Sequence, residues 1–255
     1  MSLVDEYSEQ QDSSAQVKKK HSIIPLARPI LLNALAGKTI DLDVVSPRFY
    51  NSFNYSVLAK NHTGGNFTVG LTSANEGEGK TLVAANLAVS LAIANAKETV
   101  LVDFNLRKPR VHTTFGTVLN PGVTEALNDP AIYISLTQIK HLYVLAAGVE
   151  PIPFLRQSLS DIPSTMAGRN GHGALALGDI ARFRDIVYSL KKEFDFVVID
   201  MPSILDLSVP LLLASQMDGL LIVVDAKKTT QEELESALQR VNRSSLLGFV
   251  LNRVS

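Results

Sequence analysis

A glycine-rich segment followed by lysine and threonine has the clearest chemistry in this sequence. It reads Ser73-Ala-Asn-Glu-Gly-Glu-Gly-Lys-Thr81, after an apolar run and before a helical pattern. Glycines let backbone N–H groups face phosphate oxygens, and a helix N-terminus attracts anions. The lysine can neutralise outer phosphates, and the threonine hydroxyl can join a magnesium shell. Ala74 replaces the first glycine of the common pattern G-x-x-x-x-G-K-[ST]. The residues expected to bind a nucleoside triphosphate here are Glu76, Gly77, Glu78, Gly79, Lys80, Thr81 and Leu82.

Two short apolar runs, Glu98–Asp103 and Phe194–Asp200, each end in an aspartate. Such runs are typical of strands buried on both faces of a parallel sheet, whose ligands bind beyond the carboxyl ends. We therefore expect both carboxylates to lie at the edge that carries the glycine-rich segment. The predicted catalytic residues are Lys80, Asp103 and Asp200, and the predicted magnesium ligands are Thr81, Asp103 and Asp200.

Strand and helix patterns alternate from Phe67 onward, which predicts an α/β fold with a mostly parallel, doubly wound sheet flanked by helices, as in P-loop NTPases. The expected strands are 67–72, 98–104, 142–146, 194–200, 219–225 and 248–252. The expected helices are 49–59, 81–95, 179–193, 208–216 and 231–241. Residues 107–128 are expected to be looser, residues 149–178 to form a long surface loop, and residues 22–47 to be irregular. Residues 1–21 are expected to be a polar, flexible leader.

The composition restricts the class of protein. The chain has 255 residues, 46% of them hydrophobic and 19% charged, with a net charge of −1. This balance is that of a soluble globular protein and gives no reason to expect nucleic acid as a partner. Without cysteine, disulfides and thiolate metal sites are excluded. The five histidines lack ligand spacing, no secretory signal or membrane-spanning run is apparent, and the lack of cysteine suits a reducing compartment.

Several motifs in order make the chain resemble the cytoplasmic bacterial tyrosine kinases of capsular and exopolysaccharide biosynthesis. That family has a phosphate loop like S-x-x-P-G-E-G-K-[ST], and this chain follows it except for Glu76 in place of proline. Its second motif, D-x-D-x-R-x-P, appears as Asp103-Phe-Asn-Leu-Arg-Lys-Pro109. Its third, ending in I-D-x-P-P, appears as Val197-Val-Ile-Asp-Met-Pro-Ser203, with Asp206 shortly after. The resemblance runs from about Ser46 to Val254, which implies a P-loop ATPase or kinase-like domain over residues 46–255 after a leader and approach segment over 1–45.

The resemblance implies ATP and Mg²⁺ as ligands, and either transfer of the γ-phosphoryl group to protein tyrosine or hydrolysis of ATP alone. Asp103 would orient or deprotonate a tyrosine hydroxyl, and Asp200 would act through the metal or a metal-bound water. Arg107 would compensate phosphate charge, although an exposed structural cluster with Lys108 and Arg110 is an equal alternative. Asn252 would reach the adenine, unless it is an ordinary polar strand end. The implied partner is a membrane-embedded polysaccharide chain-length regulator or co-polymerase, which would hold the chain at the inner membrane, and a homo-oligomer stays open.

The chain departs from the family in three ways. Asn105 replaces the second acid of D-x-D, an E-x-x-R-x-x-R stretch is missing after Ser46-Pro47, and no tyrosine-rich tail follows the last strand. Asn105, Glu76 and the missing tail favour an alternative function as a catalytically degenerate, nucleotide-sensing scaffold that regulates the co-polymerase. A switch ATPase of the related type that positions division sites or plasmids is a third hypothesis. It is disfavoured because Ser73, Ala74 and Asn75 offer no early lysine.

Overall fold

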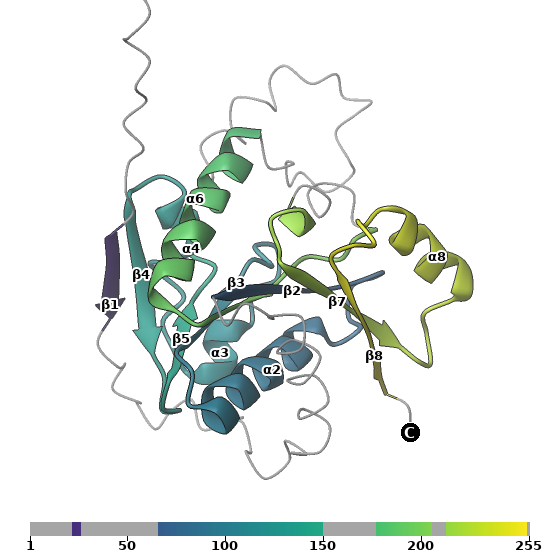
Figure 1. Ribbon diagram of the computed structural model, residues 1–255, viewed down its shortest axis with the longest axis horizontal. Helices are drawn as coiled ribbons and strands as arrows, with labels where there is room; N and C mark the ends of the chain where they lie inside the picture. Colours follow the sequence, from purple (N-terminus) through teal and green to yellow (C-terminus); the bar gives the residue numbers. More distant parts are fainter. Residues whose placement is uncertain (1–21, 27–65, 150–176, 206–212, 254–255) are drawn as a thin grey trace, which may run out of the picture.

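The computed structural model describes residues 22–26, 66–149, 177–205 and 213–253. The expected leader, the helix at 49–59, Asp206 and most of the expected 149–178 loop and 208–216 helix lie outside these residues. The described chain forms one eight-stranded sheet with helices on both faces (Figure 1). The strands are β1 (Ser22–Leu26), β2 (Phe67–Ser73), β3 (Thr99–Asp103), β4 (Ala131–Leu136), β5 (Leu142–Leu145), β6 (Phe196–Asp200), β7 (Gly219–Asp225) and β8 (Leu246–Asn252). The helices are α2 (Lys80–Asn95), α3 (Val111–Phe115), α4 (Val123–Ala126), α6 (Leu177–Glu193) and α8 (Gln231–Gln239).

The strand order across the sheet is β1-β4-β5-β3-β6-β2-β7-β8, and every neighbouring pair is parallel except β4 with β5. β2, β3, β6 and β7 are buried at every position. This explains why they appear in the sequence as continuous apolar runs. The mostly parallel, doubly wound α/β fold expected from the sequence is confirmed. The carboxyl ends of β2, β3 and β6 meet at one edge, where the candidate site lies.

The two strands at one side of the sheet were not expected. The sequence predicted an irregular segment at residues 22–47, but Ser22–Leu26 forms β1, and the region before residue 142 contains β4. Pro25 is compatible with β1 because a residue without a backbone N–H is tolerated in an edge strand, and β1 lies at the edge of the described sheet, beside β4. The region expected to be looser also contains two short helices, α3 and α4.

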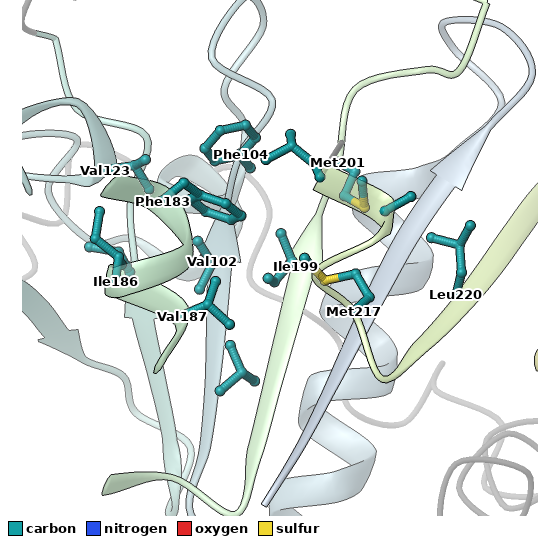
Figure 2. Packing of buried hydrophobic residues seen from close by; sticks show 14 of the residues in the cluster. Val102, Phe104, Val123, Phe183, Ile186, Val187, Ile199, Met201, Met217 and Leu220 are labelled. Carbon is teal, nitrogen blue, oxygen red and sulfur yellow. The ribbon is translucent and has the colours of Figure 1, made fainter. Parts of the chain in front are cut away.

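Two hydrophobic clusters fix the helices to the sheet. One packs α2 and α3 on one face, and the other packs α4, α6 and α8 on the opposite face (Figure 1). The apolar side chains of α6 are buried against the sheet, among them Phe183, Ile186 and Val187 (Figure 2). Phe104, directly after β3, packs on Phe183 with ring centroids 4.1 Å apart. This contact anchors the chain at the point where β3 delivers Asp103 to the site.

None of the described helices combines the length and the apolar character that crossing a membrane would require.

Candidate nucleotide site

The phosphate loop connects β2 to α2 and has the backbone shape that its glycines permit. Gly77 and Gly79 have φ values of 81° and 95°, and Gly79 is the N-cap of α2. Residues with a Cβ rarely adopt such angles. A Cβ on Gly79 would also lie 2.2 Å from the side-chain nitrogen of Asn252, so only glycine fits there. Ala74 is completely buried in the hydrophobic cluster beneath the loop, which accommodates its departure from the glycine pattern.

Lys80 and Thr81 begin α2 and face the end of β6. Lys80 is only 5% exposed, so its ammonium group lies in a largely desolvated environment. The Thr81 hydroxyl donates a hydrogen bond of 2.5 Å to Oδ2 of Asp200. Because the N-terminus of a helix carries a partial positive charge, the start of α2 adds to the charge of Lys80 at this point. The geometry therefore joins the predicted lysine, threonine and β6 aspartate at one place.

Asp200 is fully buried, with one oxygen available to a ligand. Burial raises its pKa to about 7, the neighbouring charge of Asp103 adds to this rise, and the Thr81 hydrogen bond and Lys80 charge oppose it. Its Oδ1 is buried and has no hydrogen-bond partner among the described residues. A buried carboxylate oxygen without a donor is costly. This oxygen, beside the Thr81 hydroxyl, fits a bound cation or cation-bound water, since oxygen ligands are those that magnesium prefers.

Asp103 lies beside Asp200 in the β3–β6 register, but its oxygens hold backbone groups. Oδ1 accepts from the Asn105 N–H at 3.1 Å, and Oδ2 accepts from the Arg110 and Val111 N–H groups at 3.0 Å each. Burial raises the pKa of Asp103 to about 6 against these three bonds. The carboxylate thus fixes the β3–α3 turn and the start of α3. Its predicted roles as proton acceptor and metal ligand stay predictions.

Asp103→Ala is therefore expected to destabilise the apo protein by about 2 kcal/mol, because three backbone N–H groups lose their acceptor. Urea unfolding at pH 7 measures the change. Asp200→Ala is the control, since it removes a buried acid that holds no backbone group among the described residues. A loss of stability in the Asp200 variant as large as in the Asp103 variant would contradict this assignment.

A pocket of about 360 Å³ adjoins the phosphate loop on the side of the β3–α3 loop. Glu76 and Lys108 form an ion pair there, with side chains 41% and 62% exposed. The pKa of Glu76 is lowered, chiefly by its hydrogen bond to Lys108 and further by the charges of Lys108, Arg107 and Lys80. Glu76 is thus engaged by a lysine across the pocket. The lining residues are Ala74, Asn75, Glu76, Arg107, Lys108, Ser203 and Leu205.

The remaining predicted residues lie at the periphery of the loop. Leu82 is 59% exposed on the first turn of α2. Asn252 donates from its side-chain nitrogen to the Glu78 carbonyl at 2.9 Å, so it contacts the back of the loop, and its adenine contact stays a prediction. Glu78 is 3% exposed and accepts a hydrogen bond from Thr229. Sequence reasoning missed Thr229, because nothing in a single sequence links two residues 151 positions apart.

The chain has relatives among known proteins. The family model described as an AAA domain matches residues 68–246. The tyrosine-protein kinase YwqD of Bacillus subtilis (strain 168) is 32% identical over 190 residues, which cover 72% of this chain and 71% of that protein. The tyrosine-protein kinase CpsD of Streptococcus agalactiae is 30% identical over 199 residues, covering 74% and 76%. The succinoglycan biosynthesis transport protein ExoP of Rhizobium meliloti (strain 1021) is 26% identical over 187 residues, covering 72% and 22%.

Solved structures share the fold. The kinase domain of the Escherichia coli tyrosine kinase ETK has a TM-score of 0.67 at 20% identity, covering 92% of each chain. The cell division ATPase MinD of Pyrococcus furiosus has a TM-score of 0.53 at 23% identity, covering 74% and 73%. Cobyrinic acid a,c-diamide synthase of Mycobacterium smegmatis, with bound ADP and magnesium, has a TM-score of 0.53 at 17% identity, covering 73% and 74%. By its matched domain and its sequence relatives, the chain belongs to the P-loop ATPases of the bacterial tyrosine-kinase family that includes YwqD and CpsD.

Proposed function

We propose that this chain binds Mg-ATP and transfers the γ-phosphoryl group to protein tyrosine in capsule or exopolysaccharide biosynthesis or export. The observation that carries the proposal is the buried Oδ1 of Asp200, which lies beside the Thr81 hydroxyl and Lys80 and has no hydrogen-bond partner among the described residues. Charge stabilisation and positioning supply most of the catalysis of phosphoryl transfer, so a small number of fixed groups suffices. The kinase relatives and the polysaccharide-related name of one of them support the direction of the proposal.

In the proposed transfer, different residues would bind the phosphates, hold the metal and accept the tyrosine proton. The N–H groups of the phosphate loop and the Lys80 ammonium bind the phosphates, and Thr81 and Asp200 hold Mg²⁺, which neutralises charge on the transferred group when bound. The tyrosine oxygen forms a bond to the γ-phosphorus while the bond to the β–γ bridging oxygen breaks, which releases ADP. The tyrosine proton must pass to a base. Asp103 is the proposed acceptor, and its pKa of about 6 leaves it largely ionised at neutral pH.

A non-catalytic scaffold is the second candidate, and a specific observation favours it. Both oxygens of Asp103 already hold backbone N–H groups, so accepting a proton or a metal would weaken the β3–α3 turn. Asn105 also brings no negative charge where the family motif has its second acid. In this case the chain would bind nucleotide as a signal to the polysaccharide machinery, without transferring phosphate.

The proposed partner is a membrane-embedded polysaccharide chain-length regulator or co-polymerase, with the chain on the cytoplasmic side of the inner membrane. The transport function in the name of one relative supports it. Co-sedimentation of the chain with proteoliposomes that contain the co-polymerase, against empty liposomes, tests this partner.

The test of function measures nucleotide binding, ADP release and phosphotyrosine on the same purified protein. Mg-ATP is added alone, with the co-polymerase, or with excess EDTA. EDTA-sensitive ADP release with phosphotyrosine supports the kinase, and ADP release without phosphotyrosine supports a plain ATPase. Tight binding without turnover supports the scaffold. If the protein does not bind nucleotide, all three are wrong.

Glu76→Gln is expected to tighten ATP binding about two- to fivefold at low salt, because Lys108 loses its partner and can attract phosphate. The gain in affinity should shrink at 0.5 M salt, because the distance over which exposed charges interact falls to about a few ångströms. The free energy of unfolding should change by less than about 0.5 kcal/mol, since the pair is exposed. Titration calorimetry at two salt concentrations measures the effect. Glu232→Gln, on the exposed side of α8, is the matched control, and weaker binding by the Glu76 variant would contradict the expectation.

A further inference from the structure

Two distant segments of the chain hold Glu78 in the phosphate loop. Its Oε1 accepts a hydrogen bond of 2.6 Å from the hydroxyl of Thr229, in the loop between β7 and α8. Its backbone carbonyl accepts from Asn252, at the end of β8. Its other carboxylate oxygen, Oε2, is buried without a hydrogen-bond partner among the described residues. Among the described residues, the Thr229 hydroxyl is therefore the one side-chain donor to this buried carboxylate.

Thr229 itself is fixed in position. Its backbone N–H donates to the carbonyl of Asp225 at 2.9 Å, and its hydroxyl accepts from the Asp225 N–H at 3.1 Å. The hydroxyl thus uses its acceptor capacity on β7 and its single proton on Glu78. Because both bonds come from one oxygen, replacing threonine with valine removes both while nearly preserving the shape. Serine keeps both.

The helix that follows Thr229 is capped at its start. Thr230 and Glu233 cap the helix reciprocally, with the Thr230 hydroxyl accepting from the Glu233 N–H and the Glu233 carboxylate accepting from the Thr230 N–H. The pKa of Glu233 is lowered, first by that Thr230 backbone bond and also by a side-chain hydrogen bond from Asn75. The hydrogen bond that attaches the phosphate loop to the segment before α8 is therefore the one between Thr229 and Glu78.

This attachment has a consequence for ligand binding. Gly77 and Gly79 flank Glu78, and glycine has the largest backbone freedom to lose when a loop is ordered around a ligand. Holding Glu78 between them in place restricts that freedom before the nucleotide arrives. Resting on the proposed function, we propose that Thr229 is a positioning residue that acts through Glu78 to hold the phosphate loop in the shape that receives the nucleotide phosphates.

The experiment compares Kd for Mg-ADP by titration calorimetry in the full chain. Thr229→Val is expected to weaken binding about tenfold, because a hydrogen bond to a charged group is lost, and Thr229→Ser is expected to bind like wild type. In turnover measurements KM should rise in the valine variant with a smaller change in kcat. If Thr229→Val does not fold, Thr229→Ala supplies the same comparison.

A double-mutant cycle tests the route through Glu78. Glu78→Met keeps the length of the side chain without its oxygens, and in that background Thr229→Val is expected to change Kd by less than about twofold. Equal affinity of wild type and Thr229→Val, or failure of serine to restore binding, overturns the proposal. An undiminished effect in the Glu78→Met background overturns the role of Glu78. If wild type binds no Mg-ADP, the proposed function falls as well, whereas wild-type binding with unaffected variants removes this inference alone.

Discussion

Lys80→Met is expected to lower ATP turnover by at least about 100-fold, because the variant loses a preorganised cation at the phosphates. Lys80 is 5% exposed, so water cannot readily replace the ammonium group when the side chain is changed. Methionine has a similar length and adapts to irregular packing, so the fold should be retained. Affinity for Mg-ATP should fall in parallel by roughly tenfold or more. ADP release under saturating Mg-ATP and titration calorimetry measure the two effects.

The matched control is Lys97→Met, the same substitution at the opposite end of the sheet. Lys97 precedes β3 and pairs with Asp195 at 3.2 Å, and its side chain is 48% exposed. Exposed ion pairs contribute little to stability, so neither turnover nor folding should change appreciably. If Lys80→Met retains wild-type turnover while Lys97→Met behaves as expected, ATP is consumed elsewhere and the candidate site is wrong.

The sequence predicted the central sheet well because its strands obey a strong rule. A strand buried on both faces must be apolar throughout, so β2, β3, β6 and β7 were recognisable without any knowledge of their partners. The edge strands were not, because their placement depends on pairing across the chain. β1 contains Pro25, which is acceptable because β1 is an edge strand of the described sheet, beside β4.

The site was predictable to the same degree. Lys80, Thr81 and Asp200 follow from motif order and from the geometry of parallel strands, and the structure brings them together. The roles of Asp103 and Thr229 depend on hydrogen bonds that a motif does not reveal. An aspartate that ends a strand has the same sequence signature whether it faces a ligand or caps the next turn. Only the three backbone donors distinguish the structural role of Asp103.

Asp200→Asn is expected to abolish most turnover and to stabilise the apo protein at neutral pH. Turnover should fall by roughly 100-fold, since asparagine brings no negative charge to the proposed magnesium site. The free energy of unfolding at pH 8 should rise by on the order of 1–3 kcal/mol, because the variant no longer buries a carboxylate that resists ionisation. A residue maintained at a cost in stability is the behaviour expected of a ligand-binding group.

The raised pKa of Asp200 determines how the free energy of unfolding changes with pH. The pKa of Asp200 is raised from 3.8 in the unfolded chain to about 7 in the fold, so between these values the folded state binds more protons than the unfolded state. Stability from this group therefore falls as pH rises from about 4 to about 7, and stays low above that. Urea unfolding without nucleotide or magnesium, at intervals from pH 4 to pH 8, should show a steeper decline for wild type than for Asp200→Asn. Asp103 contributes a smaller decline in stability to wild type and Asp200→Asn alike, since its pKa is also raised, to about 6.

Asp195→Asn provides the control, because that carboxylate is 37% exposed and pairs with Lys97 away from the site. The Asp195→Asn variant should turn over ATP like wild type. The difference between its free energies of unfolding at pH 4 and pH 8 should also match that of wild type. Mg-ATP should raise the unfolding temperature of wild type more than that of Asp200→Asn, since a ligand that binds the folded state more tightly stabilises that state more. Wild type and Asp200→Asn could instead be equally stable at pH 8 and equally stabilised by Mg-ATP. In that case burial of the ionised Asp200 would not lower the free energy of unfolding, and no cation would bind there. The buried oxygen on which the proposed function rests would then have no ligand to explain it.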